Sequence, residues 1–134
     1  MHTLANWSLL RLALMTDAAA SGTMGVLLAA AADPLAAWFG MPVPLLREVG
    51  LLLIPYAGLL VYLASKNVTP RLPAQIVVAG NVLWVVLGSV ALLVSGLVAP
   101  TALGTAFVIA QTLIVAILAE LQVMGLKRQR LAAA

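Results

Sequence analysis

Long apolar segments alternate with short polar connections along the chain. They predict four helices, at about residues 4–32, 45–65, 72–96 and 101–126. A helix rises about 1.5 Å per residue, so about 20 apolar residues cross the roughly 30 Å hydrocarbon core of a bilayer. Each segment is long enough to do so. The pattern therefore predicts an all-α, polytopic membrane protein built as an antiparallel bundle of four transmembrane helices.

The connections are short, which places successive helices side by side in opposite directions. The first connection begins with Asp33 and Pro34, which can start a helix as N-cap and first-turn residue. We expect a short interfacial helical turn at about 34–40, with Trp38 and Phe39 turned inward.

The composition supports a lipid-facing surface. The chain is 64% hydrophobic and 8% charged, whereas a soluble domain carries roughly 25% charged residues. No polar stretch is long enough for a soluble module, so residues 1–134 should form a single domain. There is no cysteine, and His2 is the one histidine, which argues against thiolate, heme and histidine metal sites. We expect no cofactor, no metal and no hydrolytic catalysis.

Lysine and arginine are distributed unevenly between the two sides of the bundle. One predicted side carries Arg11, Lys66, Arg71, Lys127, Arg128 and Arg130. Near the first connection there is only Arg47. The positive-inside rule then places both termini in the cytoplasm, and we expect a bacterial inner membrane. The net charge of +3 indicates topology and contacts with lipid head groups rather than binding to nucleic acid.

Asp17 interrupts the first apolar segment, which also argues against a cleaved signal peptide there. A carboxylate at this depth costs at least about 2.5–3.5 kcal/mol on insertion scales, so it should face the bundle interior and have a partner. Ser21 continues the same helix face one turn later. Two interpretations stay open: a buried polar contact that fixes helix packing, or a protonatable binding site.

Asn81 lies at a depth similar to that of Asp17, and Trp84 follows it by one turn. A buried indole N–H needs an acceptor. We therefore expect Asp17, Asn81 and Trp84 to form one polar cluster. The cluster would either contribute to a binding site or only hold the helices together by hydrogen bonds. Pro55 should kink the second helix beside Tyr56. Because such kinks often line cavities, Tyr56 is a further candidate binding residue.

The fourth helix carries a seven-residue repeat: Gly104, Gln111, Leu118 and Gly125. This stripe, with Gln122 beside it, should face the bundle, and Gln111 is a candidate binding residue. Glu120 lies about 180° from Gln111 at 100° per residue, so it cannot share the stripe. We expect a structural ion pair between Glu120 and Arg11, or between Glu120 and a basic residue of a second copy of the chain.

Two adjacent stretches read Asp33-Pro-Leu-Ala-Ala-Trp-Phe-Gly-Met-Pro and Leu45-Leu-Arg-Glu-Val-Gly-Leu. They resemble the DoxX-type superfamily of four-helix membrane proteins, in which a proline-bearing short helix follows the first span. The resemblance covers about the first half of the chain. Relatives in that superfamily include sterol isomerases and receptors for lipophilic ligands, with acidic residues facing a central cavity. The resemblance implies analogous positions for Asp17 and Glu48.

The leading hypothesis is a small, non-catalytic integral membrane protein that binds a lipophilic molecule, such as a quinone, lipid or sterol-like compound. The second is a proton-coupled exporter similar to the small multidrug transporters, which would use Asp17. The third is an accessory subunit of a larger membrane complex. Partners would be the bilayer and a lipophilic small molecule, with a homodimer or a larger complex as further options. Ligand binding requires an apolar pocket, transport a water-accessible cavity, and a subunit a broad apolar face without a pocket.

Overall fold

A computed structural model gives the structure of the protein and describes residues 8–96 and 98–133. The described chain is almost entirely helical, in the order α1 (Leu9–Ala30), α2 (Ala32–Phe39), α3 (Val43–Ala64), α4 (Arg71–Leu83), the π-helix η2 (Trp84–Val90), α5 (Ala91–Ser95) and α6 (Ala102–Ala133). Four stretches are long and apolar enough to cross a membrane: α1, α3, the continuous rod α4–η2–α5, and α6. The prediction of an all-α, four-helix, multi-pass membrane protein is confirmed.

The predicted helix bounds agree with the structure to within a few residues, with two exceptions. The beginning of the first predicted helix, 4–7, lies outside the described residues. The last helix continues past 126 to Ala133, because no glycine or proline follows Gly125 to end it. At 32 residues α6 is about 48 Å long, well beyond the thickness of the hydrocarbon core.

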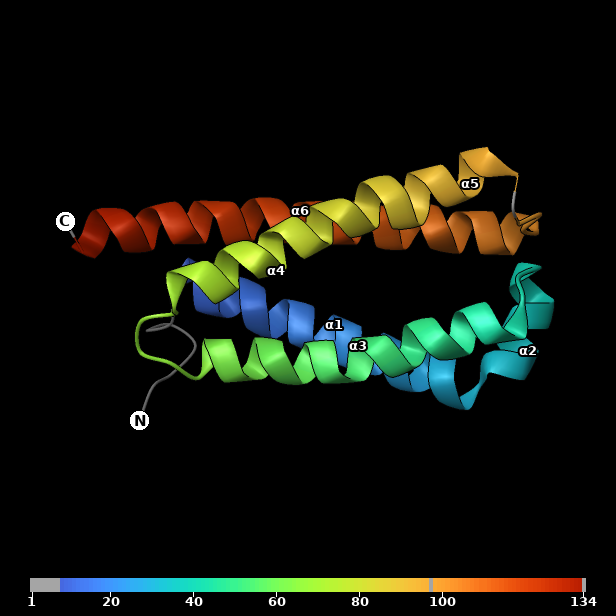
Figure 1. The fold of residues 1–134 in the computed structure, drawn as a ribbon, viewed down its shortest axis with the longest axis horizontal. Coiled ribbons are helices and arrows are strands. Elements are labelled where there is room, and N and C mark those ends of the chain that lie inside the picture. The colour runs from blue at the N-terminus through green and yellow to red at the C-terminus, as the bar shows by residue number, and fades with distance from the viewer. Residues whose placement is uncertain (1–7, 97, 134) are drawn as a thin grey trace.

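The spans form a ring that is open along one side. The closest backbone packing runs from α3 to α1, from α1 to α6, and from α6 to α4. The backbone of α3 makes no comparably close contact with α4 or η2, and in Figure 1 the rod diverges from α3 toward the end that carries α2. The antiparallel bundle therefore has a loose side between its second and third spans.

Small residues allow the tight contacts on the closed sides of the ring. A Cβ added to Gly125 of α6 would lie 2.6 Å from Leu10 Cα of α1. A Cβ added to Gly50 of α3 would lie 2.7 Å from Gly25 O of α1. Close backbone approach through small residues is the usual packing mode in membranes, where no hydrophobic effect drives helices together.

The predicted interfacial turn is present as α2, which begins at Ala32. Asp33 is not its N-cap, because Ala31 holds that position. Asp33 lies in the first turn, where a carboxylate complements the helix dipole, and its Oδ2 is 3.5 Å from Arg47 Nη2. Phe39 is buried against Phe107, with ring centroids 4.6 Å apart. Trp38 remains 61% exposed on the protein surface, so its insertion into the membrane interface stays a prediction.

Candidate functional site

Asp17 is buried at the centre of the bundle, with 3% of its surface exposed. Its Oδ1 accepts a hydrogen bond from Ser21 Oγ at 3.0 Å. Its Oδ2 accepts from Gln122 Nε2 at 2.8 Å and from Asn81 Nδ2 at 3.1 Å. The predicted contact between Asp17 and Asn81 is therefore formed, and all of these donors are neutral groups.

The same network reaches every span. Tyr56 Oη of α3 donates to Asn81 Oδ1 of α4 at 2.7 Å and lies 3.4 Å from Asp17 Oδ2. Because one hydroxyl proton serves one acceptor at a time, the shorter contact to Asn81 is the effective bond. Asn81 Nδ2 also donates to Gln122 Oε1 of α6 at 2.9 Å. We call Asp17, Ser21, Tyr56, Asn81 and Gln122 the central cluster.

Trp84 does not join the central cluster, which corrects the prediction. Its Nε1 donates to Gln111 Oε1 at 2.8 Å, and Gln111 Nε2 donates to Ser89 Oγ at 2.8 Å. Trp84 and Ser89 both belong to η2. A π-helix has a wider turn than an α-helix, which alters the directions of its side chains, and such segments often mark functional sites. Here it holds the rod to α6 through Gln111.

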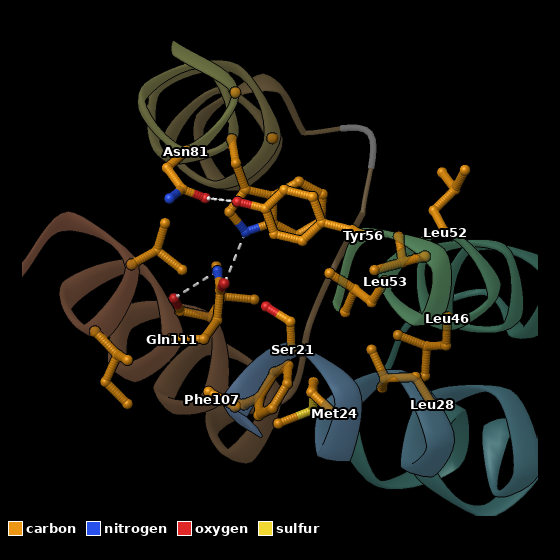
Figure 2. Close-up of a pocket in the computed structure, with 18 of the residues that line it drawn as sticks. Ser21, Met24, Leu28, Leu46, Leu52, Leu53, Tyr56, Asn81, Phe107 and Gln111 are labelled. Atoms are coloured by element: carbon orange, nitrogen blue, oxygen red, sulfur yellow. Dashed lines mark hydrogen bonds between the residues drawn. The ribbon is translucent and has the colours of Figure 1, made fainter. Parts of the chain in front are cut away.

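A cavity of about 710 Å³ lies between the four spans. All six candidate binding residues line it: Asp17, Ser21, Tyr56, Asn81, Trp84 and Gln111. Most of the remaining wall is apolar and includes Met24, Leu28, Leu46, Leu53 and Phe107 (Figure 2). Along the helices the wall runs from Asp17 to Leu28 and from Tyr56 to Leu45. The central cluster therefore closes one end of the cavity. The cavity volume is in the usual range for a small-molecule site.

The cavity reaches the lipid-facing surface on the loose side of the ring. Leu52 of α3 and Leu87 of η2 both line it, yet they are 70% and 63% exposed. These residues flank the place where α3 lacks close backbone contact with the rod. The cavity is therefore open to the lipid-facing surface between α3 and η2.

The predicted ion pair between Arg11 and Glu120 is not formed within the described part of the chain. Arg11 Nε donates to Ala64 O at 2.8 Å, at the end of α3, where the last carbonyls of a helix lack intrahelical donors. Glu120 is exposed and off the buried stripe of α6, as its angle predicts. A pair with a second copy of the chain stays a prediction. Glu48 is exposed and does not line the cavity. The expectation that Glu48 takes a position analogous to that of Asp17 is therefore wrong.

Sequence reasoning placed Gln122 on the packing seam but did not recognise it as a partner of Asp17. Its position beside Gln111 on the stripe was the available signal, since a buried amide needs partners. Ser89 was missed because an uninterrupted α-helix was expected there. Among the described residues, no group of three or more histidine, cysteine, aspartate or glutamate side chains could hold a metal ion.

No protein-family model matches the chain, and neither a curated protein nor a solved structure does. The resemblance to the DoxX-type superfamily therefore stays a prediction. The structure itself defines the class: a small multi-pass membrane protein of four helices, with a polar cluster at one end of an apolar cavity.

Proposed function

We propose that this protein binds a lipophilic small molecule in the cavity, within a bacterial inner membrane and without catalysing a reaction. The observation that supports this most strongly is the cavity itself, which is apolar along its length and polar at one end. A quinone, a lipid or a sterol-like molecule has the same division between an apolar body and a polar head. The opening between Leu52 and Leu87 lets such a molecule arrive from the bilayer.

The polar end decides selectivity. Lipid tails are as apolar as the cavity wall, so an apolar body gains no hydrophobic free energy by leaving the bilayer. Affinity must come from shape and from hydrogen bonds to the head. Asp17 Oδ1 accepts from Ser21 Oγ, and a carboxylate oxygen has two lone pairs. A ligand head that carries a hydroxyl or N–H donor is therefore favoured over a head with acceptors alone. Among the ligands named, a sterol-like alcohol or a quinone in its reduced, hydroxyl-bearing form meets this condition, and an oxidised quinone does not.

The orientation proposed from the basic residues places the cavity toward the outer side of the membrane. The start of α1, the start of α4 and the end of α6 lie at one end of the bundle (Figure 1). That end carries Arg71, Lys127 and Arg130. The cavity wall extends from the central cluster toward the opposite end, where α2 lies. With the basic end in the cytoplasm, a ligand enters from the outer half of the bilayer.

Replacing either of two glycines by a bulky residue gives a matched pair of variants that tests the cavity. Gly80 lines the cavity, whereas Gly58 does not, and a Cβ added at either position would meet nothing within 4 Å. The wild type, Gly80→Phe and Gly58→Phe are purified in mild detergent, and bound lipophilic molecules are extracted and quantified by mass spectrometry. We expect one class of molecule to copurify with the wild type and with Gly58→Phe, and to be depleted from Gly80→Phe.

The proposal fails if no lipophilic molecule copurifies in near-stoichiometric amount, or if Gly80→Phe retains as much as Gly58→Phe. Circular dichroism and thermal unfolding of the three proteins show that the comparison is between folded chains. A bulky side chain at either glycine also removes helix-weakening flexibility, so both variants are expected to fold.

The second candidate, a proton-coupled transporter, is favoured by the position of Asp17. Its carboxylate lines the cavity and has no ion-pair partner among the described residues. Proteoliposomes with an imposed pH gradient test it, with a lipophilic fluorescent amine as probe. Transport by the wild type that is lost in a folded Asp17→Asn variant would favour this candidate. The third hypothesis, an accessory subunit, is supported less well, because it does not require a cavity.

A further inference from the structure

A second hollow lies at the opposite end of the bundle from α2, between the start of α4 and the end of α6. Its volume is about 330 Å³. Three cationic side chains line it: Arg71 from α4, and Lys127 and Arg130 from α6. Val78, Val123 and Leu126 form an apolar wall beside them. We call this hollow the basic groove. It is separate from the cavity and does not depend on the function proposed for the cavity.

The three cations have no acidic partner in the described part of the chain. Among the described residues, Asp33 and Arg47 form an ion pair, but it lies at the other end of the bundle. Glu120 lies about 10 Å from Lys127 along α6 and does not line the groove. Like charges gathered on one face repel each other. An anion bound among them would relieve this repulsion.

The groove lies at the depth of lipid head groups. The C-terminal turns of α6 extend past the roughly 30 Å hydrocarbon core, because the helix is about 48 Å long. Arg71 is the first residue of α4, so it also lies at the membrane boundary. From Arg71 the apolar wall continues along α4 to Val78, about 10 Å deeper. A charged mouth above an apolar wall matches a phospholipid better than it matches a free anion.

The two sides of the groove are held together by side-chain hydrogen bonds. Thr69 N donates to Gln129 Oε1 at 3.1 Å, and Gln129 Nε2 donates to Thr69 O at 2.9 Å. These paired bonds fasten the connection before α4 to the last turns of α6. The helix ends that carry Arg71 and Arg130 are therefore held together before any ligand arrives, which lowers the entropic cost of binding.

We propose that the basic groove binds an anionic phospholipid of the cytoplasmic leaflet. The phosphate lies among Arg71, Lys127 and Arg130, and one acyl chain lies along Val78 and Val123. Basic pockets between membrane helices are suited to such head groups, because each nearby cation strengthens the attraction. Guanidinium groups also bind phosphate oxygens in a bidentate manner.

A pair of charge-matched variants tests the groove. K127Q/R130Q removes two of its cations, whereas K66Q/R128Q removes two cations from the same end of the bundle that do not line it. Native mass spectrometry in a nonionic detergent measures binding of phosphatidylglycerol, with phosphatidylcholine as the zwitterionic reference. We expect K127Q/R130Q to bind phosphatidylglycerol about thirtyfold more weakly than the wild type. K66Q/R128Q should stay within about twofold of the wild type, since it leaves the groove intact.

Three results would overturn the proposal. Equal weakening of phosphatidylglycerol binding in both double variants would mean that the whole basic end of the protein attracts the lipid, and not the groove. Equal binding of phosphatidylcholine would mean that charge is not recognised. If millimolar inorganic phosphate displaced bound phosphatidylglycerol as effectively as added lipid does, the groove would be a site for a free anion. Should K127Q/R130Q unfold, Arg71→Gln on the facing helix provides the second variant, and it must weaken phosphatidylglycerol binding as well.

Discussion

Tyr56 Oη donates a hydrogen bond to Asn81 Oδ1 over 2.7 Å, and this bond joins α3 to α4, two helices without close backbone contact. It crosses the loose side of the ring at the polar end of the cavity (Figure 2). The side opening between Leu52 and Leu87 lies further along the same seam. The hydrogen bond therefore helps to hold α3 and the rod together at this level of the bundle.

Tyr56→Phe tests this bond by removing one oxygen and keeping the ring. An interhelical hydrogen bond in a membrane protein contributes about 0.6 kcal/mol on average and up to about 1.7 kcal/mol. We expect the free energy of unfolding in mixed micelles to fall by an amount in this range. Tyr62→Phe is the matched control on the same helix, because Tyr62 is 56% exposed. It should be neutral, and an equal loss in both variants would contradict the role of Tyr56.

Asp17→Asn and Asp17→Ala should destabilise the protein to different degrees. Asparagine can keep an oxygen toward Gln122 Nε2 and Asn81 Nδ2, and turn its amide toward the Ser21 hydroxyl, which can accept. Alanine takes the acceptor from all three donors, Gln122 Nε2, Asn81 Nδ2 and Ser21 Oγ, and a buried donor left unsatisfied costs about 1–3 kcal/mol. We therefore expect stability in the order wild type, Asp17→Asn, Asp17→Ala, measured by thermal unfolding in detergent. Equal stability of the two variants would show that the donors find other partners.

The spans and the pairing of Asp17 with Asn81 could be predicted because they depend on distance along a helix axis. Apolar length fixes where a helix crosses the bilayer, and residue count fixes depth. The interior location of Gln122 likewise followed from its angle on α6. These quantities are nearly independent of how the helices pack.

The errors arose where packing between helices decides. Trp84 was expected beside Asp17, but it lies one helical turn beyond Asn81, where its Nε1 meets Gln111 of α6 instead. The angle of Glu120 was correct, but it did not say which helix Arg11 faces, and Arg11 bonds to Ala64 O of α3. A cavity beside Asp17, Asn81 and Trp84 was expected and is present. Its size and side opening could not be predicted, because they result from the separation of α3 from the rod.

Gly125→Ala and Gly58→Ala should have opposite effects on stability. A Cβ at Gly125 would lie 2.6 Å from Leu10 Cα and Leu10 N, so α1 and α6 must move apart. Overpacking of this kind costs about 1–3 kcal/mol. At Gly58 the added methyl group meets nothing within 4 Å, and alanine favours the helix by about 0.5–1 kcal/mol. Chemical unfolding in mixed micelles measures both. Destabilisation by Gly58→Ala as large as that by Gly125→Ala would refute the close packing of α1 on α6.

The orientation in the membrane can be tested by single cysteines, because the chain has none of its own. Ala99 in the third connection, Val68 in the second and Leu131 near the end of α6 are all exposed. With the basic end in the cytoplasm, a membrane-impermeant maleimide added to intact cells should label Ala99→Cys. It should label Val68→Cys and Leu131→Cys only after the membrane is permeabilised. The reverse pattern would invert the orientation. Labelling of Ala99→Cys and Leu131→Cys from the same side would mean that α6 does not cross the bilayer.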